Sequence, residues 1–129
     1  MAHYLFNFSA GDREQARALL QAKTWGVARD ERYGGALAPG DLALIYVPTD
    51  FIGRAELATA VREGEVALAW VEEWDRAVPM DAVVQRIDPT GSNPYVQANA
   101  ASGFQSEVVE ITADEYEAAV ALSREAGSR

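Results

Sequence analysis

The sequence predicts an α+β fold in which helices flank a mixed, strongly curved sheet. Stretches with strand propensity are interspersed along the chain with stretches of helical spacing. The central strand-like stretches are joined by short turns, which leave room only for antiparallel pairing. The 129 residues are enough for one core and show no domain linker or internal repeat, so we expect a single domain over residues 1–129.

The first two elements are an aromatic strand and a short helix. Residues 3–8 alternate in part, which turns Tyr4, Phe6 and Phe8 to one face of a strand. Asp12 is a candidate N-cap and the residues after it have helical spacing, so we expect a helix from about residue 12 to residue 22.

An extended corner and a loop come next. Gly26 permits backbone angles or close approaches that other residues cannot reach, so we expect residues 24–27 to hold Trp25 at a rigid corner. The stretch from Arg29 to Gly35 has no apolar periodicity and is typical of a surface loop that carries binding residues.

Three strands in a meander form the centre of the predicted sheet. The turn Pro39-Gly40-Asp41 leads into Leu42 to Val47, which is apolar throughout, as a strand buried on both faces would be. A second strand is expected from Phe51 to Ala60, and a short turn joins it to a third from Val66 to Trp74. Gly53 inside the second strand indicates a bulge or a close approach by a ligand or another backbone.

Beyond the meander the chain is expected to leave the sheet over Asp75 to Met80. Pro79 is suited to the first position of a short helix that reaches about Val84. The stretch from Asp88 to Gly103 has the composition of a long loop, and a loop of that length inside one domain is usually functional or mobile.

The last two elements are a short strand and a helix. The strand is expected at Val108 to Ile111, and the helix from about Ala113 to Ala126, with Gly127 after its end. Thr112 and Glu115 have the spacing of a capping box at the start of this helix.

Charge limits the partners that this chain can bind. The net charge is −9, and it is uneven: residues 1–60 hold 6 basic and 7 acidic side chains, whereas residues 61–129 hold 5 and 13. A strongly acidic protein repels a phosphate backbone, so we expect no nonspecific duplex binding. A nucleic-acid site would have to be local and to lie in the nearly neutral first half.

Composition also argues against several classes of site. The chain has no cysteine and a single histidine, His3, so disulfides, thiolate zinc sites, catalytic triads and other metal sites are not expected. Neither Glu72-Glu73 nor Asp114-Glu115 resembles an acid/base pair, because such pairs converge from separated elements. We expect no enzyme and no cofactor.

The cellular location is also predicted from composition. Apolar runs are far shorter than the ~20 residues of a membrane helix, and the first ten residues lack the basic start of a signal peptide. We expect a soluble, cytoplasmic protein. Ten arginines against one lysine, with 24 alanines, are typical of a G+C-rich bacterial genome.

Three motifs in order carry a resemblance to a known family. They are Trp25-Gly26-Val27, then Pro39-Gly40-Asp41 opening an apolar strand with Tyr46, then the stretch FIGRAE from Phe51 to Glu56. In this order and spacing they resemble the EVE domain, a family of the PUA-like superfamily that is related to YTH domains. The resemblance implies a small barrel-like curved sheet of about five to six strands flanked by helices.

The resemblance also implies a function, because EVE and YTH domains read modified bases. Several of them bind methylated or hydroxymethylated cytosine or methylated adenine as a flipped-out base in an aromatic cage. The implied base-binding residues are Trp25 as the first cage tryptophan, Gly26 and Val27 beside it, Asn7 and Ser9 at the base edge, and Gln97 and Asn99 closing the pocket. The implied phosphate contacts are Arg29, Arg32 and Arg54.

Some of these assignments have alternatives. Trp25 also fits a core position, since tryptophan is usually well buried. The second cage aromatic is open among Trp70, Trp74 and Tyr95. Arg54 is suited equally to a phosphate contact and to an ion pair with Glu56 or Asp50.

The function predicted from the sequence is therefore a noncatalytic reader of a modified or flipped-out base in DNA or RNA. The alternative is a module that has lost nucleic-acid binding and instead binds a nucleoside, a small anion or a protein partner.

Overall fold

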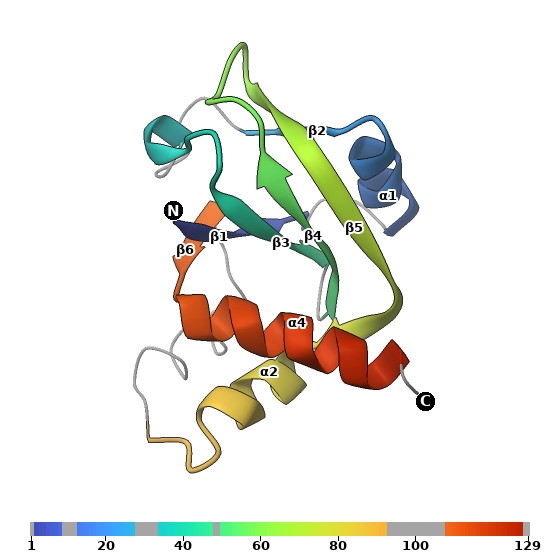
Figure 1. Cartoon of the computed structure of the whole chain (residues 1–129), viewed down its shortest axis with the longest axis vertical. Helices are drawn as coiled ribbons and strands as arrows, with labels where there is room; N and C mark the ends of the chain where they lie inside the picture. Colours follow the sequence, from blue (N-terminus) through green and yellow to red (C-terminus); the bar gives the residue numbers. More distant parts are fainter. Residues whose placement is uncertain (1, 9–12, 28–33, 48–49, 93–107, 128–129) are drawn as a thin grey trace.

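A computed structural model of the chain arranges the six strands that it describes in one curved, mixed sheet (Figure 1). The structure describes residues 2–8, 13–27, 34–47, 50–92 and 108–127. The strands are β1 (His3–Asn7), β2 (Thr24–Gly26), β3 (Leu42–Val47), β4 (Asp50–Leu57), β5 (Glu65–Pro79) and β6 (Val108–Ile111). Their order across the sheet is β2-β5-β4-β3-β1-β6. β1 pairs parallel with β3, and the other described pairs are antiparallel, which confirms the predicted α+β class.

Helices cover the two faces of this sheet. They are α1 (Arg13–Gln21), α2 (Met80–Ile87) and α4 (Ala113–Gly127), and a short 3₁₀ helix, η1 (Gly34–Ala36), precedes β3. Figure 1 shows α2 and α4 side by side on one side of the sheet and α1 on the other. Within the described residues, α1 agrees with the predicted helix to within a residue at each end.

Two hydrophobic cores lie on opposite faces of the sheet. The core on the α1 side, here the α1-side core, includes Phe6, Leu20, Trp25, Ile45 and Leu57. The core under α2 and α4, here the α4-side core, includes Leu5, Leu44, Trp74, Val83 and Tyr116. The strands supply both cores because successive side chains point to opposite faces. The alternation of Tyr4, Phe6 and Phe8 in one direction is as predicted.

β3 has the bounds predicted from its apolar sequence and is covered on both faces. Ala43, Ile45 and Val47 contribute to the α1-side core, and Leu44 and Tyr46 contribute to the α4-side core. A strand buried on both sides has no need for polar alternation, which explains its continuous apolar sequence.

The hairpin between β4 and β5 is built on a two-residue turn. Arg62 and Glu65 exchange backbone hydrogen bonds of 2.8 and 3.1 Å. Glu63 and Gly64 between them have φ angles of 53° and 81°, the left-handed values that a tight hairpin turn of this length prefers. β4 ends at Leu57, three residues earlier than predicted, because the chain turns toward this corner.

The prediction that the chain leaves the sheet after Trp74 is wrong, because β5 continues to Pro79. The pairing register of β4 and β5 explains how the strand continues past Trp74. Gly53 lies opposite Glu73, and Phe51 lies opposite Val78, so residues 74–77 of β5 face Ile52 alone. The strand bulges away from β4 and then rejoins it. Burial of Val78, only 2% exposed, favours this return.

The helix after β5 also differs from its prediction. Pro79 ends the strand opposite Asp50 and is the N-cap residue, so α2 begins at Met80 and continues to Ile87 instead of Val84. Met80 and Val83 are buried in the α4-side core, and Ile87 at the end of the helix also packs against it.

The C-terminal elements follow the prediction closely. β6 has the predicted bounds and pairs with β1. The capping box is present: the Glu115 N–H donates to Thr112 Oγ1 at 3.1 Å, and the Thr112 N–H donates to Glu115 Oε1 at 3.3 Å. α4 includes Gly127, which was expected just beyond it. None of the described helices is both long and apolar enough to cross a membrane.

Candidate base-binding site

Trp25, the predicted stacking residue, lies in the α1-side core. It belongs to the edge strand β2 and pairs with Val66 of β5. Its ring stacks on Phe6, with 5.9 Å between ring centroids and 20° between planes, and meets the ring of Phe8 edge-on at 5.5 Å. The side chain is 2% exposed. Trp25 is therefore a core residue in this structure, and its stacking on a base stays a prediction.

The aromatic neighbours of Trp25 differ from those proposed for the second cage position. Among the described residues, Phe6 and Phe8 of the β1 segment make ring contacts with Trp25. Trp74 is in the α4-side core, and Trp70 contacts Arg54, which bonds to Tyr116 of that core. Trp70 and Trp74 therefore do not complete a cage around Trp25. The partial alternation of the first strand held the signal for Phe6 and Phe8.

Gly26 and Val27 follow Trp25 with opposite degrees of burial. Val27 is buried in the α1-side core, and its N–H donates to the Gly64 carbonyl at 2.8 Å. Gly26 does not have the positive φ seen at Gly64, and a Cβ added to it would meet no atom within 4 Å. The expectation that this position requires glycine for its backbone angles or for close packing within the chain is therefore wrong. The edge beside Trp25 is open at Gly26.

Asn7 ends β1 and is buried, with 6% exposed. It lies opposite Tyr46 of β3, and the next residue, Phe8, donates its N–H to the Tyr46 carbonyl at 2.8 Å. Strand alternation places Asn7 on the face of Leu5, away from Phe6 and Phe8. The structure thus does not bring the side chains of Asn7 and Trp25 to one face.

Arg54 is held on the α4 side of the sheet. Its Nη2 donates to Glu72 Oε2 at 3.1 Å and its Nη1 donates to Tyr116 Oη at 3.3 Å. The predicted ion-pair partners, Glu56 and Asp50, are wrong: the Arg54 partner is Glu72, and Asp50 pairs with Arg13 at 3.2 Å.

Around Arg54 the structure forms a polar cluster, here the Arg54 cluster, of Arg54, Trp70, Glu72, Trp74 and Tyr116. The Arg54 guanidinium lies 5.3 Å from the centre of the Trp70 ring. Trp74 Nε1 donates to Glu72 Oε1 at 2.8 Å. Partial burial alone would raise the pKa of Glu72, but the hydrogen bonds from Trp74 and Arg54 outweigh it and leave the pKa below its ordinary value. Burial raises the pKa of Tyr116.

Comparisons with known proteins identify solved structures that share this fold. Neither a protein-family model nor a curated protein matches the sequence. Solved structures match it over nearly the whole chain. The structure of human thymocyte nuclear protein 1 in complex with DNA containing 5-methylcytosine has a TM-score of 0.68 and 12% identity, and covers 95% of this chain and 98% of that one.

Two further structures have the same arrangement. The YTH domain of Mmi1 in complex with RNA has a TM-score of 0.62 and 11% identity, and covers 98% of this chain and 81% of that one. A Pseudomonas putida protein has a TM-score of 0.69 and 17% identity, with coverages of 95% and 99%. This chain therefore has the same fold as these structures, the PUA-like fold that the resemblance to EVE and YTH domains implied. At these identities the likeness shows the fold alone.

Several predicted site residues of this PUA-like chain fall outside the described residues. These are Ser9, Gln97, Asn99, Arg29 and Arg32, together with Tyr95. The described part of the predicted site is therefore Trp25, Gly26 and Val27 on one side of the sheet, with Asn7 and Arg54 on the other. No group of three or more metal-ligating side chains occurs in the part of the chain that the structure describes.

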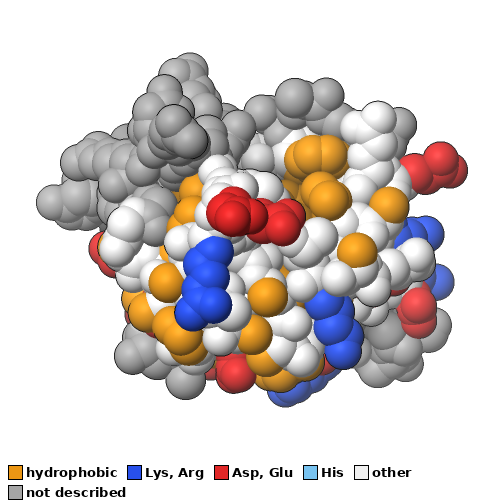
Figure 2. Space-filling model, turned by 90° about the horizontal axis from the view of Figure 1, so that it is seen from above, with side chains coloured by type: hydrophobic (Ala, Val, Ile, Leu, Met, Phe, Trp, Pro, Cys, Tyr) orange, Lys and Arg blue, Asp and Glu red, His pale blue; other side chains and the backbone are white. Residues whose placement is uncertain are grey.

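Charged side chains do not form one basic surface on the end of the molecule drawn in Figure 2. Lysine and arginine side chains are scattered there among acidic, hydrophobic and uncharged ones. Arg13 and Arg54 are both in ion pairs with carboxylates. On this end of the molecule the described residues thus form no continuous basic track for a phosphate backbone.

Proposed function

We propose that this chain is a noncatalytic domain that binds a modified or flipped-out base of DNA or RNA. The observation that carries the proposal is the fold, which matches over nearly its whole length solved structures that hold 5-methylcytosine DNA and RNA. Because fold alone does not define function, the proposal also needs a site with suitable chemistry.

The aromatic cluster of Phe6, Phe8 and Trp25 supplies that chemistry. A base offers a π-face, and stacking on an aromatic side chain is worth about 1–3 kcal/mol per base. A methyl group on the base adds apolar area that an aromatic pocket buries favourably. Phe8 is only partly buried and Gly26 leaves an open edge, so this cluster lies close to the surface.

Binding at this cluster requires a change of shape. Trp25 is 2% exposed, so a base reaches the indole ring only after the groups that cover it move. We expect the bound form to differ from this structure beside β2, and the sheet itself to stay unchanged. The free energy of that opening would lower the affinity, since only the open fraction of molecules can bind.

Titration of short oligonucleotides tests the proposal. Matched DNA and RNA strands would differ at one base only: unmodified cytosine or adenine, 5-methylcytosine, 5-hydroxymethylcytosine or N6-methyladenine. We expect one modified strand to bind at least about tenfold more tightly than its unmodified match, a difference of roughly 1.4 kcal/mol. We also expect no chemical change in the bound strand.

Variants connect such binding to the predicted site. Trp25→Ala and the milder Phe8→Ala are expected to remove the preference for the modified base. Trp70→Ala is the matched control, because Trp70 lies on the opposite side of the sheet. Circular dichroism identifies variants that fail to fold. Equal, negligible binding of all strands, unchanged in the Trp25 and Phe8 variants, would refute the proposal, and tight binding of free nucleosides alone would favour a small-molecule pocket.

A further inference from the structure

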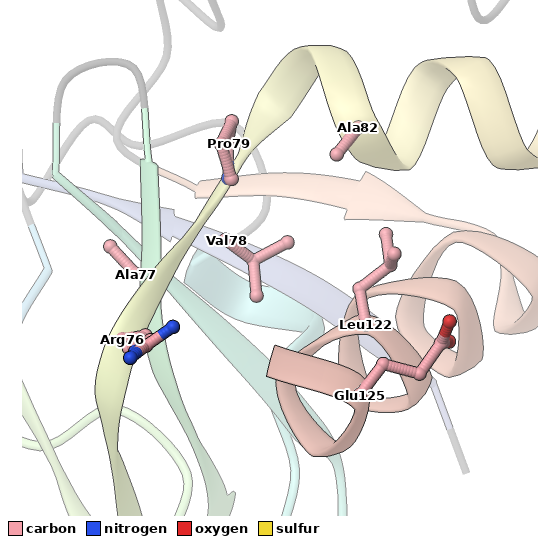
Figure 3. A pocket seen from close by; sticks show the side chains of 7 residues that line it. All are labelled: Arg76, Ala77, Val78, Pro79, Ala82, Leu122 and Glu125. Carbon is pink, nitrogen blue, oxygen red and sulfur yellow. The ribbon is translucent and has the colours of Figure 1, made fainter. Parts of the chain in front are cut away.

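A hollow lies beside the α4-side core, which includes the lining residue Val78 and against which the lining residue Leu122 packs. It has a volume of about 250 Å³ and lies between the end of β5, the start of α2 and the C-terminal part of α4 (Figure 3). Its lining comes from β5 (Arg76, Ala77, Val78, Pro79), α2 (Ala82) and α4 (Leu122, Glu125). All of these residues belong to the described part of the chain.

The bulge in β5 creates this hollow. Residues 74–77 face a single residue of β4, so the strand bends out before Val78 restores the pairing opposite Phe51. Pro79 then starts α2 in a new direction. The two helices pack on each other and on the α4-side core, but they do not fill the space beside the bend. Val78, with 2% exposed, forms part of an apolar floor.

The charged side chains at the edge of the hollow favour an anionic ligand. Arg76 at its edge is exposed and has no ion pair or hydrogen bond within the described residues. Glu125 at the other side is bound by Arg86 through two hydrogen bonds of 2.6 and 2.9 Å. Figure 3 shows the Arg76 and Glu125 side chains on either side of Val78 and Leu122. The Arg76 guanidinium is therefore available to a ligand, whereas the Glu125 carboxylate is already paired with Arg86.

The ligand class follows from these contacts. A guanidinium binds a carboxylate through two parallel hydrogen bonds, which a neutral amide cannot match. Apolar side chains from three elements suit an aliphatic or aromatic body. Asp75 and Asp81 lie next in sequence to the lining residues, and the net charge of the chain is −9, so a second negative charge would be repelled.

We propose that this hollow binds small monocarboxylates with an aliphatic or aromatic body, and that Arg76 holds their carboxylate. The site is separate from the aromatic cluster of Phe6, Phe8 and Trp25 and does not depend on the proposed function. Ala82 of α2 faces the hollow, so a larger side chain at position 82 would occupy the space of the ligand body.

Calorimetric or NMR titration of the full chain with 4-phenylbutyrate tests this site. We expect a dissociation constant of roughly 1 mM, the range for a ligand of about a dozen non-hydrogen atoms. The matched amide, 4-phenylbutyramide, and the amine, 4-phenylbutylamine, are expected to bind at least about tenfold more weakly. Arg76→Gln should weaken the carboxylate at least about tenfold and remove its advantage over the amide.

Two further variants make the result decisive. Arg17→Gln makes the same charge change on α1, on the opposite side of the sheet, and should leave carboxylate binding unchanged. Ala82→Leu should abolish binding while the circular dichroism spectrum stays that of the folded chain. Equal binding of carboxylate and amide, no binding of either, or an undiminished affinity in Arg76→Gln would overturn the proposal. Oligonucleotide binding should be the same in Arg76→Gln and the parent chain, which separates this test from that of the proposed function.

Discussion

At the scale of single residues, Gly53 shows how the absence of a side chain lets two strands approach each other closely. A Cβ built on Gly53 would lie 2.4 Å from the backbone oxygen of Glu72 on the neighbouring strand. Backbone cannot move aside as a flexible side chain can. The bulge of β5 begins beside this position, at the pairing of Gly53 with Glu73. Glycine at 53 therefore permits the close approach of β5 to β4.

The first prediction is that Gly53→Ala lowers the free energy of unfolding by about 1–3 kcal/mol, the usual range for overpacking. Urea unfolding of the purified protein measures it. Gly26→Ala is the control: an added Cβ there meets no atom within 4 Å, so we expect a change within about 0.5 kcal/mol. Equal stability of both variants and the parent would contradict this account of β4 and β5.

Arg54 shows what a sequence can and cannot predict about one residue. From the sequence, Arg54 was suited equally to a phosphate contact and to an ion pair with Glu56 or Asp50. The partner is Glu72, which lies directly opposite on β5. Only the strand register identifies it. Gly53 indicated a bulge or a close approach in this strand, but not the register that places Arg54 opposite Glu72.

Glu72 makes stability depend on pH. Its folded-state pKa lies below its ordinary value of 4.5. The ionised form is therefore favoured by folding, and its contribution is complete above pH 4.5 and is lost as the pH falls through the lower folded-state pKa. Burial opposes the shift, whereas the hydrogen bonds from Trp74 and Arg54 produce it.

We predict that Glu72→Gln lowers the free energy of unfolding at pH 7 by about 0.5–1 kcal/mol, a small value because the Glu72 side chain is 43% exposed. The difference from the parent should shrink as the pH falls below 4.5. Glu73→Gln, at an exposed neighbouring position, serves as the control and should change stability little at either pH. Urea unfolding at several pH values measures both; a pH-independent difference for Glu72→Gln would be evidence against the ion pair.

At the scale of elements, local signals predicted well and long-range ones did not. The capping box before α4 needs only residues 112–115, so its prediction from sequence is confirmed. β3 was predicted with its observed bounds because a continuous apolar run after a turn is typical of a strand buried on both faces. β5 was predicted to end at Trp74, yet Asp75 and Arg76 occupy the bulge and Val78 is buried where the strand rejoins β4.

Thr112→Ala is predicted to lower the free energy of unfolding by about 1 kcal/mol, because the Glu115 N–H at the start of α4 would lose its hydrogen-bond acceptor. Thr112→Ser keeps the hydroxyl and should retain most of that stability. Thermal and urea unfolding compare the two. A loss of the same size in both variants would show that the methyl group, not the cap, matters at this position.

At the scale of the whole molecule, the order of strands and helices predicted an α+β fold with a mixed, curved sheet, and the structure has that fold. The candidate site was harder to predict, because it depends on which side chains share a face. Trp25 was placed at a corner, but its contacts with Phe6 and Phe8 arise from the curvature that brings β2 toward β1. Asn7 and Arg54 were grouped with Trp25 by sequence and lie on the other face.

The three tryptophans give a direct view of base binding, since their indole N–H groups have separate NMR signals. Trp25 belongs to the α1-side core, whereas Trp74 donates its indole N–H to Glu72 on the other side, where Trp70 contacts Arg54. The most direct measurement follows these signals in a ¹⁵N-labelled sample during titration with a modified-base oligonucleotide. We predict that the Trp25 signal moves while those of Trp70 and Trp74 stay; unchanged indole signals, or changes at Trp70 and Trp74 alone, would contradict a base site at Trp25.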